Sequence, residues 1–188
     1  MENLFDQTIE NQDFTNTGLE GKEFDNCVFK SCDFSNVSLS GITFLECRFE
    51  ECDLSMVKLY NTSLKDVKFQ NCKMLGVNFN EANAFMMLMD FENCMLNLSL
   101  YFQLKLKSIQ FRKCSMHEVD FSEADLTGAI FDDCDLSNAT FDQTILEKAN
   151  FTSAYSYSID PEKNRLKKAK FASNGLVGLL GKYDLAIE

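Results

Sequence analysis

Eight cysteines, a single histidine and 29 acidic residues are the groups in this 188-residue sequence that could do chemistry. Thiolates serve as nucleophiles or zinc ligands, histidine as a general base, and paired carboxylates as acid and base. The cysteines lack CxxC spacing, and no glycine-rich phosphate loop or GxSxG motif is present. His117 falls on a position expected to face solvent. The sequence therefore predicts a protein that is not an enzyme and has no catalytic, cofactor or metal site.

The composition describes a folded, acidic protein. Apolar residues make up 45% and charged residues 25% of the chain, and the formal net charge is −11. Such a body is repelled by DNA, RNA and anionic lipid, so we expect neither direct nucleic-acid binding nor membrane binding. The N-terminus has no apolar signal core, and eight cysteines without export indicate reduced thiols. The expected location is cytoplasmic.

Apolar residues recur with a period of five. Every fifth residue from Leu4 to Phe79 is apolar, and the pattern resumes from Met86 to Phe151 after a shift of two residues placed at 80–85. A second set, two residues before each of these centres, holds small or β-branched side chains and includes all eight cysteines. The pattern predicts that the thiols are buried core groups.

A period of five fits neither a helix nor a flat strand. Two inward residues in every five require the chain to turn a corner once per repeat, so four repeats close a square coil of 20 residues. Stacked coils pair as short parallel strands about 4.8 Å apart. A coil cannot bury its own centres, so stacking supplies the core. The expected fold is an all-β, quadrilateral parallel β-helix, a rod roughly 36 Å long.

Residues 4–154 resemble the pentapeptide repeat family. Its A(D/N)LXX consensus is matched by Asp-Phe-Ser-Asn-Val at 33–37, Ala-Asp-Leu-Thr-Gly at 124–128 and Cys-Asp-Leu-Ser-Asn at 134–138. The resemblance implies a right-handed β-helix, a hand that agrees with the general rule for parallel crossovers.

The C-terminal segment departs from the repeat. We divide the chain into a β-helix at 1–154 and a final partial repeat with a short helix and tail at 155–188, the break being marked by Pro161. Leu166 and Phe171 return to the five-residue pattern. A helix over 173–181, capped by Ser173 or Asn174 and ended by Gly181, has an apolar stripe. We expect this stripe to form a homodimer interface, with capping of the rod's end as the alternative; its residues are Leu176, Val177, Leu179, Leu180, Tyr183 and Leu185.

Four stretches resemble the quinolone-resistance (Qnr-like) branch of the family. They are 159–164 (Ile-Asp-Pro-Glu-Lys-Asn), 167–171, the tail 183–187, and 72–77, which is also similar to albicidin-resistance proteins. The resemblance implies a DNA mimic that binds a type II topoisomerase, DNA gyrase or topoisomerase IV, and relieves poisoning by quinolones. The better-known members carry projecting loops that this sequence lacks. Simple inhibition of the enzyme, or immunity to a peptide toxin, therefore stays open beside protection.

Residues 20 apart in the sequence should share a side of the coil. On this basis two neighbouring sides carry ten acidic residues and only two basic ones, Lys58 and Lys73. Nine of these acids are expected to face the partner: Asp13, Asp33, Asp53, Glu118, Asp135, Glu20, Asp120, Glu123 and Asp142. Glu81 is the tenth acid on these sides. Residues one coil apart stack at about 4.8 Å, comparable with the roughly 3.4 Å between phosphates on a DNA strand. The alternative is a solvated face that only confers solubility.

Around the shift, outward positions become apolar. They are Phe85, Met87, Leu88, Met95, Leu98, Leu100 and Phe102. An exposed patch of this kind is typical of a contact site, unless the inserted residues fold over it. The alternative function is therefore an acidic structural or adaptor rod that binds another protein through residues 85–102.

Overall fold

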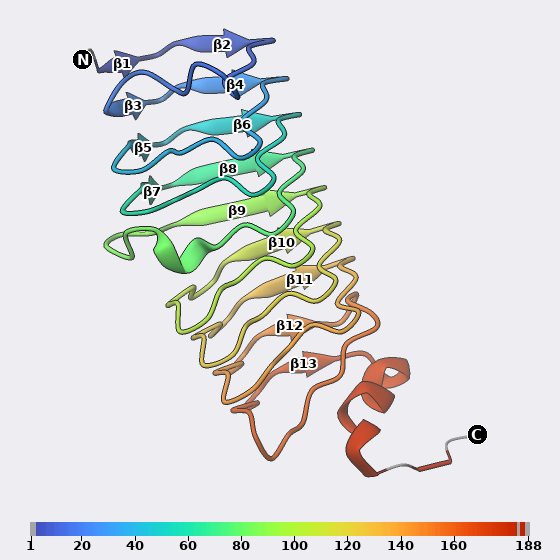
Figure 1. The fold of residues 1–188 in the computed structure, drawn as a ribbon. Coiled ribbons are helices and arrows are strands. Elements are labelled where there is room, and N and C mark those ends of the chain that lie inside the picture. Colours follow the sequence, from blue (N-terminus) through green and yellow to red (C-terminus); the bar gives the residue numbers. More distant parts are fainter. Residues whose placement is uncertain (1–2, 184, 187–188) are drawn as a thin grey trace.

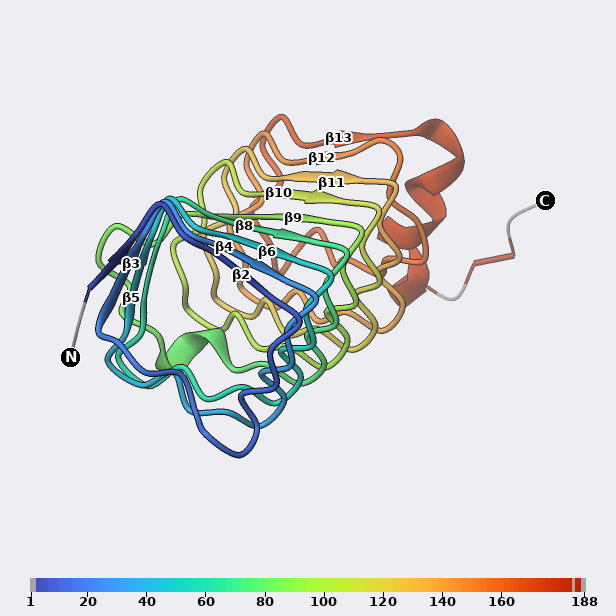
Figure 2. The same cartoon turned by 90° about the horizontal axis from the view of Figure 1, so that it is seen from above.

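The computed structural model describes residues 3–183, 185 and 186 of the chain. The chain forms a right-handed, four-sided parallel β-solenoid of about eight coils, which confirms the fold expected from the five-residue period (Figures 1 and 2). The N-terminal coil lies at one end of the rod, and the C-terminal turns lie at the other (Figure 1). No helix among the described residues has the length and apolarity that crossing a bilayer requires.

Two of the four sides carry regular strands. Side 1 is a four-stranded parallel sheet made of β1 (Leu4–Phe5), β3 (Glu23–Asp25), β5 (Thr43–Leu45) and β7 (Ser63–Lys65). Side 2 is a nine-stranded parallel sheet made of β2 (Thr8–Glu10), β4 (Val28–Lys30), β6 (Arg48–Glu50), β8 (Val67–Gln70), β9 (Met89–Glu92), β10 (Gln110–Arg112), β11 (Ile130–Asp132), β12 (Asn150–Phe151) and β13 (Lys170–Phe171).

The other two sides are held by single parallel bridges. Side 3 contains the bridges Asp13↔Asp33 and Asp33↔Asp53, and side 4 contains Ser38↔Lys58 and Leu100↔Asp120. We call residues that stack in this way, one coil apart, a column. Columns on all four sides are therefore fixed by backbone hydrogen bonds.

A left-handed backbone residue makes most of the corners. Two residues after most centres, φ is positive; examples are Asn36 (φ 60°) and Asn138 (φ 57°). At many of these corners the next residue donates its N–H back to the centre's carbonyl, as Val37 does to Phe34 at 3.0 Å. Asparagine, aspartate and glycine tolerate this conformation best, and asparagine occupies many of the corners.

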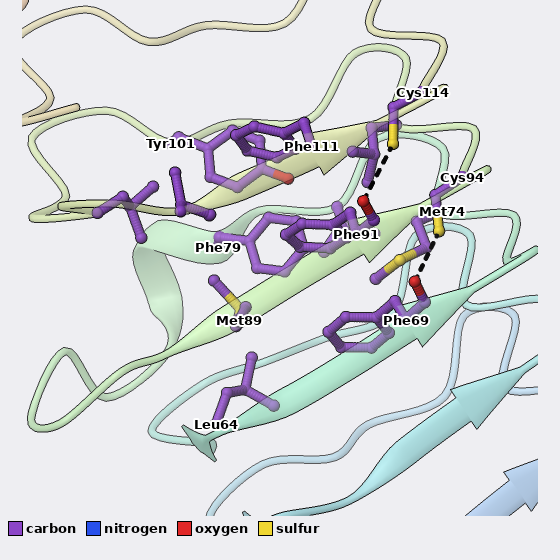
Figure 3. Close-up of a cluster of buried hydrophobic side chains, with 14 of the residues drawn as sticks. Leu64, Phe69, Met74, Phe79, Met89, Phe91, Cys94, Tyr101, Phe111 and Cys114 are labelled. Atoms are coloured by element: carbon purple, nitrogen blue, oxygen red, sulfur yellow. Dashed lines mark hydrogen bonds between the residues drawn. The ribbon is translucent and has the colours of Figure 1, made fainter. Parts of the chain in front are cut away.

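The core is a set of stacked aromatic columns. On side 2, eight phenylalanines stack from β4 to β13, with successive ring centroids 4.7–5.3 Å apart; they are Phe29, Phe49, Phe69, Phe91, Phe111, Phe131, Phe151 and Phe171. Figure 3 shows the middle of this column, beside Phe79 and Tyr101 from side 4. Stacked rings at this spacing add attraction to the area that they bury.

All eight cysteines are buried and free, as the sequence predicted. Each thiol donates to a backbone carbonyl of the preceding coil, for example Cys94 to Phe69 at 3.4 Å and Cys114 to Phe91 at 3.8 Å (Figure 3). Burial raises the pKa of the Cys47 thiol to about 12. The Cys47 thiol is therefore a poor nucleophile at neutral pH.

The register shift differs in detail from the prediction. Asn83 still bridges Ser63, whereas Met89 pairs with Val67, so the two extra residues lie between 84 and 88 and not at 80–85. The backbone register puts Ala84, which is exposed, at the centre position of this coil. Met86, the centre predicted from the sequence, is a corner residue (φ 58°) that is 67% exposed. Met87, predicted to face outward, is half-buried and packs against the core.

The insertion leaves the columns aligned. The short 3₁₀ helix η1 (Phe79–Glu81) precedes it, and side 3 then continues without rotation through the bridges Asp53↔Lys73, Lys73↔Met95 and Ser115↔Asp135. Two residues added at a corner lengthen the loop without shifting the stacked sides.

The C-terminal segment forms two 3₁₀ helices, η2 (Ser173–Leu179) and η3 (Gly181–Tyr183), and not one regular helix with a capping side chain. Ala172 holds the cap position, and no side chain caps η2 there. Ile159 donates its N–H to Gly178 at 2.9 Å, and Leu179 packs against the core. The segment therefore covers part of its own rod, as the end-capping alternative requires. The tail residues 184 and 187 lie outside the described residues.

Candidate protein-binding surface

Sides 3 and 4 carry the acids that the sequence assigned to them. Because the columns are not rotated at the insertion, acids from both halves of the rod share these two sides. We call this set the acidic surface: Asp13, Glu20, Asp33, Asp53, Glu81, Glu118, Asp120, Glu123, Asp135 and Asp142. Two of its members make local ion pairs, Asp53 with Lys73 at 3.0 Å and Asp142 with Lys163 at 3.7 Å.

The aspartates of this surface also have a structural role that the sequence analysis missed. The Asp33 carboxylate accepts the backbone N–H of Ser35 at 2.8 Å, and Asp120 accepts that of Ser122 at the same distance. The same Asx turn is made by Asp13, Asp53 and Asp135. Aspartate followed two residues later by serine or threonine was the signal available in the sequence.

Hydrogen bonding favours the ionised form of three of these carboxylates, those of Asp13, Asp53 and Asp135. The Thr15 hydroxyl and N–H lower the pKa of Asp13. Partial burial opposes ionisation of Asp53 and Asp135. However, hydrogen bonds from Ser55 and Ser137, together with the neighbouring Lys73 and His117, outweigh burial and leave both pKa values lowered. Asp13, Asp53 and Asp135 are therefore negatively charged at neutral pH.

His117 lies on the surface, where the sequence placed it. Its Nε2 lies 2.7 Å from Asp135 Oδ2, and its side chain is 46% exposed. Among the described residues, no group of three or more His, Cys, Asp or Glu side chains is arranged to hold a metal ion. What sides 3 and 4 do offer is a charged surface that is suited to binding.

The outward apolar residues predicted around the shift do not form one surface. Phe85, Met86 and Leu88 belong to the inserted corner on side 1. Met95 lies on side 3, Leu98 at the corner between sides 3 and 4, and Leu100 and Phe102 on side 4. The structure adds two exposed residues that the sequence analysis missed, Met56 at 56% and Tyr60 at 71% exposure.

Only some of the residues predicted to form the dimer interface are exposed in the C-terminal turns. Leu179 contacts the chain's own core, and Leu180 is half-buried. Four others remain exposed by 46–57%: Leu176, Val177, Tyr183 and Leu185. Lys182 fastens this segment through ion pairs with Asp160 at 2.8 Å and Glu162 at 2.7 Å.

Comparison with protein families identifies the chain. A pentapeptide repeat region model matches residues 22–100 and 42–121, and a model of pentapeptide repeats in eight copies matches 114–152. These matches span more than half of the sequence, so the chain belongs to the pentapeptide repeat family. A search of curated protein sequences gave no match.

Solved structures show the same fold at low identity. HetL, a pentapeptide repeat protein involved in heterocyst differentiation regulation in Nostoc sp. strain PCC 7120, aligns with a TM-score of 0.63 and 18% identity over 88% of this chain and 84% of that one. A trypsin-treated variant of QnrB1, a plasmid-mediated fluoroquinolone resistance protein, aligns with a TM-score of 0.59 and 17% identity over 100% of both chains. Full-length QnrB1 gives 0.53 and 16% over 98% and 100%.

Proposed function

We propose that this protein is a non-catalytic DNA mimic that binds a type II topoisomerase, DNA gyrase or topoisomerase IV, and modulates its inhibition by quinolones or similar poisons. The supporting observation is that the acidic surface occupies two adjacent sides of one unrotated rod. The structural likeness to QnrB1, a fluoroquinolone resistance protein, supports the choice of partner. The protein would act in the cytoplasm.

The mechanism is steric and electrostatic. Acidic columns with a repeat of about 4.8 Å present negative charge to a Lys/Arg surface that otherwise holds DNA phosphates. Complementary charge accelerates the encounter and opposes wrong partners, and the attraction weakens as salt screens it. Occupation of that surface would displace DNA and thereby remove the complex on which a quinolone acts.

The test separates the charge of the aspartates from their role in the turns. In the quadruple variant Asp13→Asn, Asp33→Asn, Asp120→Asn and Asp135→Asn, each amide oxygen still accepts the turn N–H while four charges are lost. We expect the melting temperature to stay close to wild type, and the Kd for purified gyrase to rise by at least about 30-fold at low salt. The matched control removes four charges from sides 1 and 2: Asp25→Asn, Asp66→Asn, Asp132→Asn and Asp133→Asn.

A supercoiling assay, with and without a quinolone, reads out the function itself. Wild type should change supercoiling or quinolone sensitivity, the quadruple variant should lose that effect, and the control should keep it. The proposal fails if wild type has no effect on either readout up to tens of micromolar. It also fails if the two variants behave alike.

We further propose a homodimer formed through the exposed residues of the C-terminal turns, since an apolar patch at the end of a rod suits a twofold contact. Val177→Asp places a charge in that patch at a side chain that is 55% exposed, so the fold should tolerate it. We expect sedimentation to give half the wild-type mass. Met86→Asp, an exposed apolar residue of side 1, is the control. An unchanged mass for Val177→Asp would refute this interface.

The second candidate function is an adaptor rod that binds another protein through its exposed apolar residues. Phe102, which is 38% exposed beside Leu100, favours it, and HetL shows that a rod of this fold can have a regulatory role. Salt-resistant capture of a partner other than a topoisomerase, abolished by Phe102→Asp, would support this function over DNA mimicry.

A further inference from the structure

Exposed apolar side chains interrupt the acidic surface halfway along the rod. They lie on sides 3 and 4, and we call them the apolar band: Met56, Tyr60, Met95, Leu98, Leu100 and Phe102. We propose that the apolar band is the anchor of the binding surface, and that its partner presents apolar side chains between two basic clusters. This inference rests on the proposed function and describes the topoisomerase surface that the protein would recognise.

Two columns hold four of the six band residues, and Met95 and Leu100 lie beside them in columns of their own. Along the corner between sides 3 and 4, Met56 donates its N–H to Leu75 at 2.8 Å, Gly76 to Asn97 at 2.9 Å and Leu98 to His117 at 2.9 Å. These bonds stack Met56, Gly76 and Leu98 in one column. On side 4, Tyr60 and Phe102 hold equivalent positions, one coil on either side of η1. The band therefore spans three coils, about 10 Å.

Two residues of the band, Met56 and Leu98, have a backbone conformation that is unfavourable for their side chains. Of the 25 described non-glycine residues with positive φ, only Met56 (56°), Met86 (58°) and Leu98 (64°) are apolar. The left-handed region is sterically unfavourable for a bulky residue, because its Cβ crowds the backbone. Met56 and Leu98 are also 56% and 54% exposed, so burial returns little of that cost. Fold stability does not explain these two residues, whereas a contact with a partner does.

Gly76 lets the band lie flat. A Cβ added there would approach Met56 Sδ to 2.6 Å, so the methionine side chain lies across the glycine. Gly76 also has φ 65°, a conformation in which glycine has no steric penalty. The two apolar corner residues are thus separated by a position without a side chain, and a partner group can rest over all three.

Charge on both sides of the band defines its partner. Asp13 and Asp33 lie in the coils before Met56 and Tyr60, and Glu118 and Asp120 follow one coil after Leu98 and Leu100. Asp53 and Glu81 lie beside the band in its own coils, and Asp53 is paired with Lys73. A second copy of this chain is a poor occupant, because pairing through this surface sets acids against acids in either direction. Anionic lipid and nucleic acid are repelled for the same reason. The remaining match is a protein surface with Lys or Arg on both sides of an apolar centre.

The two components should have separable effects. The acids contribute mainly to the rate of encounter and to the salt dependence, while a desolvated apolar centre contributes affinity that salt does not screen. Binding that depended on charge alone would vanish at high salt. With the apolar band engaged, a measurable part of the affinity should remain.

The test is the double variant Met56→Asn with Leu98→Asn. Asparagine tolerates positive φ better than methionine or leucine, so the variant should fold at least as stably as wild type. With purified DNA gyrase as the probe, we expect its Kd to rise by about 10-fold or more at both about 0.1 M and about 0.5 M salt, with the salt slope unchanged. The quadruple aspartate variant should instead reduce the slope. Met86→Asn, an exposed corner residue on side 1, is the matched control.

The outcomes distinguish the two proposals. If wild type binds gyrase and the double variant binds with the same Kd at both salt concentrations, the inference is overturned while the proposed function stands. A parallel loss in Met86→Asn would also overturn it, because the effect would then not belong to the band. If wild type binds neither gyrase nor topoisomerase IV, the proposed function fails, and the inference fails with it.

Discussion

Replacing Phe91 with alanine should reduce the free energy of unfolding by about 4 kcal/mol. Phe91 is 1% exposed and lies at the middle of the side 2 column, stacked on Phe69 at 5.1 Å and on Phe111 at 5.3 Å. Its edge also meets the rings of Phe79 and Tyr101, at 5.8 and 6.4 Å (Figure 3). Truncation would remove the transfer free energy of one ring and leave a cavity between two coils that cannot close.

Phe14→Ala is the matched control. Phe14 belongs to the first coil, is half-buried and stacks only on Phe34, at 4.7 Å. Phe14→Ala should therefore reduce the free energy of unfolding by about 1–2 kcal/mol, which is less than half the effect of Phe91→Ala. Urea unfolding followed by circular dichroism gives both values. In a repeat protein each coil is stabilised by its neighbours, so equal losses at the two positions would contradict the stacked-column description of the core.

The five-residue period predicted the fold because a four-sided coil has one five-residue repeat on each side. The central residue of each side points inward and must be apolar. Because the coils stack, outward residues that are one coil apart share a column. That is why acids as far apart in sequence as Asp33 and Asp135 were assigned correctly to one side. The insertion was harder to place. Met86 fits the apolar pattern better than Ala84, but backbone pairing keeps Ala84 in register and leaves Met86 at the corner.

The C-terminal turns were predicted less well, because contacts from elsewhere determine their form. A Cβ at Gly178 would clash with the carbonyl oxygen of Tyr157, and one at Gly175 would clash with the Tyr157 hydroxyl. The two glycines therefore allow the segment to lie directly against the rod, where Ile159 donates its N–H to Gly178 at 2.9 Å. The apolar stripe in the sequence gave its amphipathic character, but not the surface that Leu179 covers.

The acidic part of the candidate surface was predicted from the sequence, and the apolar part was predicted incompletely. The acids were found by stepping through the coil, since charge needs no knowledge of contacts. Four residues of the apolar band (Met95, Leu98, Leu100 and Phe102) were predicted as outward apolar residues, but Met56 and Tyr60 were missed because they are isolated apolar residues in their own repeats. They join Leu98 and Phe102 only when the coils stack. Backbone dihedrals, which the sequence does not give, were needed to single out Met56 and Leu98.

Asn164→Asp should cost about 3 kcal/mol at neutral pH and loosen residues 155–186 from the rod. At a regular corner the backbone closes on itself, as Ala124 N–H does on the Phe121 carbonyl at 3.1 Å. At 141–144 the side-chain amide of Asn164 lies between the Thr144 N–H and the Phe141 carbonyl. Its Oδ1 accepts the Thr144 N–H at 2.8 Å, and its Nδ2 donates to the Phe141 carbonyl at 2.9 Å. Nδ2 also donates to the Asp160 carbonyl at 3.0 Å, which ties in the segment where the repeat breaks.

A carboxylate has the shape of this amide but cannot donate. Asn164 is 7% exposed, so the aspartate variant would bury a charge against two carbonyl oxygens and leave that of Phe141 without its hydrogen-bond donor. Such an environment raises the pKa of the introduced carboxyl. A raised folded-state pKa adds stability below the unfolded value, near 4, and loses it as the pH rises. The variant should therefore regain much of its deficit relative to wild type when the pH falls from about 7 to about 4.

Hydrogen exchange and thermal unfolding at both pH values check this expectation. Exchange should accelerate in residues 155–186, with the coils before residue 120 unchanged. Asn150→Asp is the control. Asn150 accepts the Thr152 N–H at 3.1 Å in the same turn in which Asp125 accepts that of Thr127, so aspartate suits that position. Equal stability of Asn164→Asp and wild type at neutral pH would show that the backbone can close this corner without the amide.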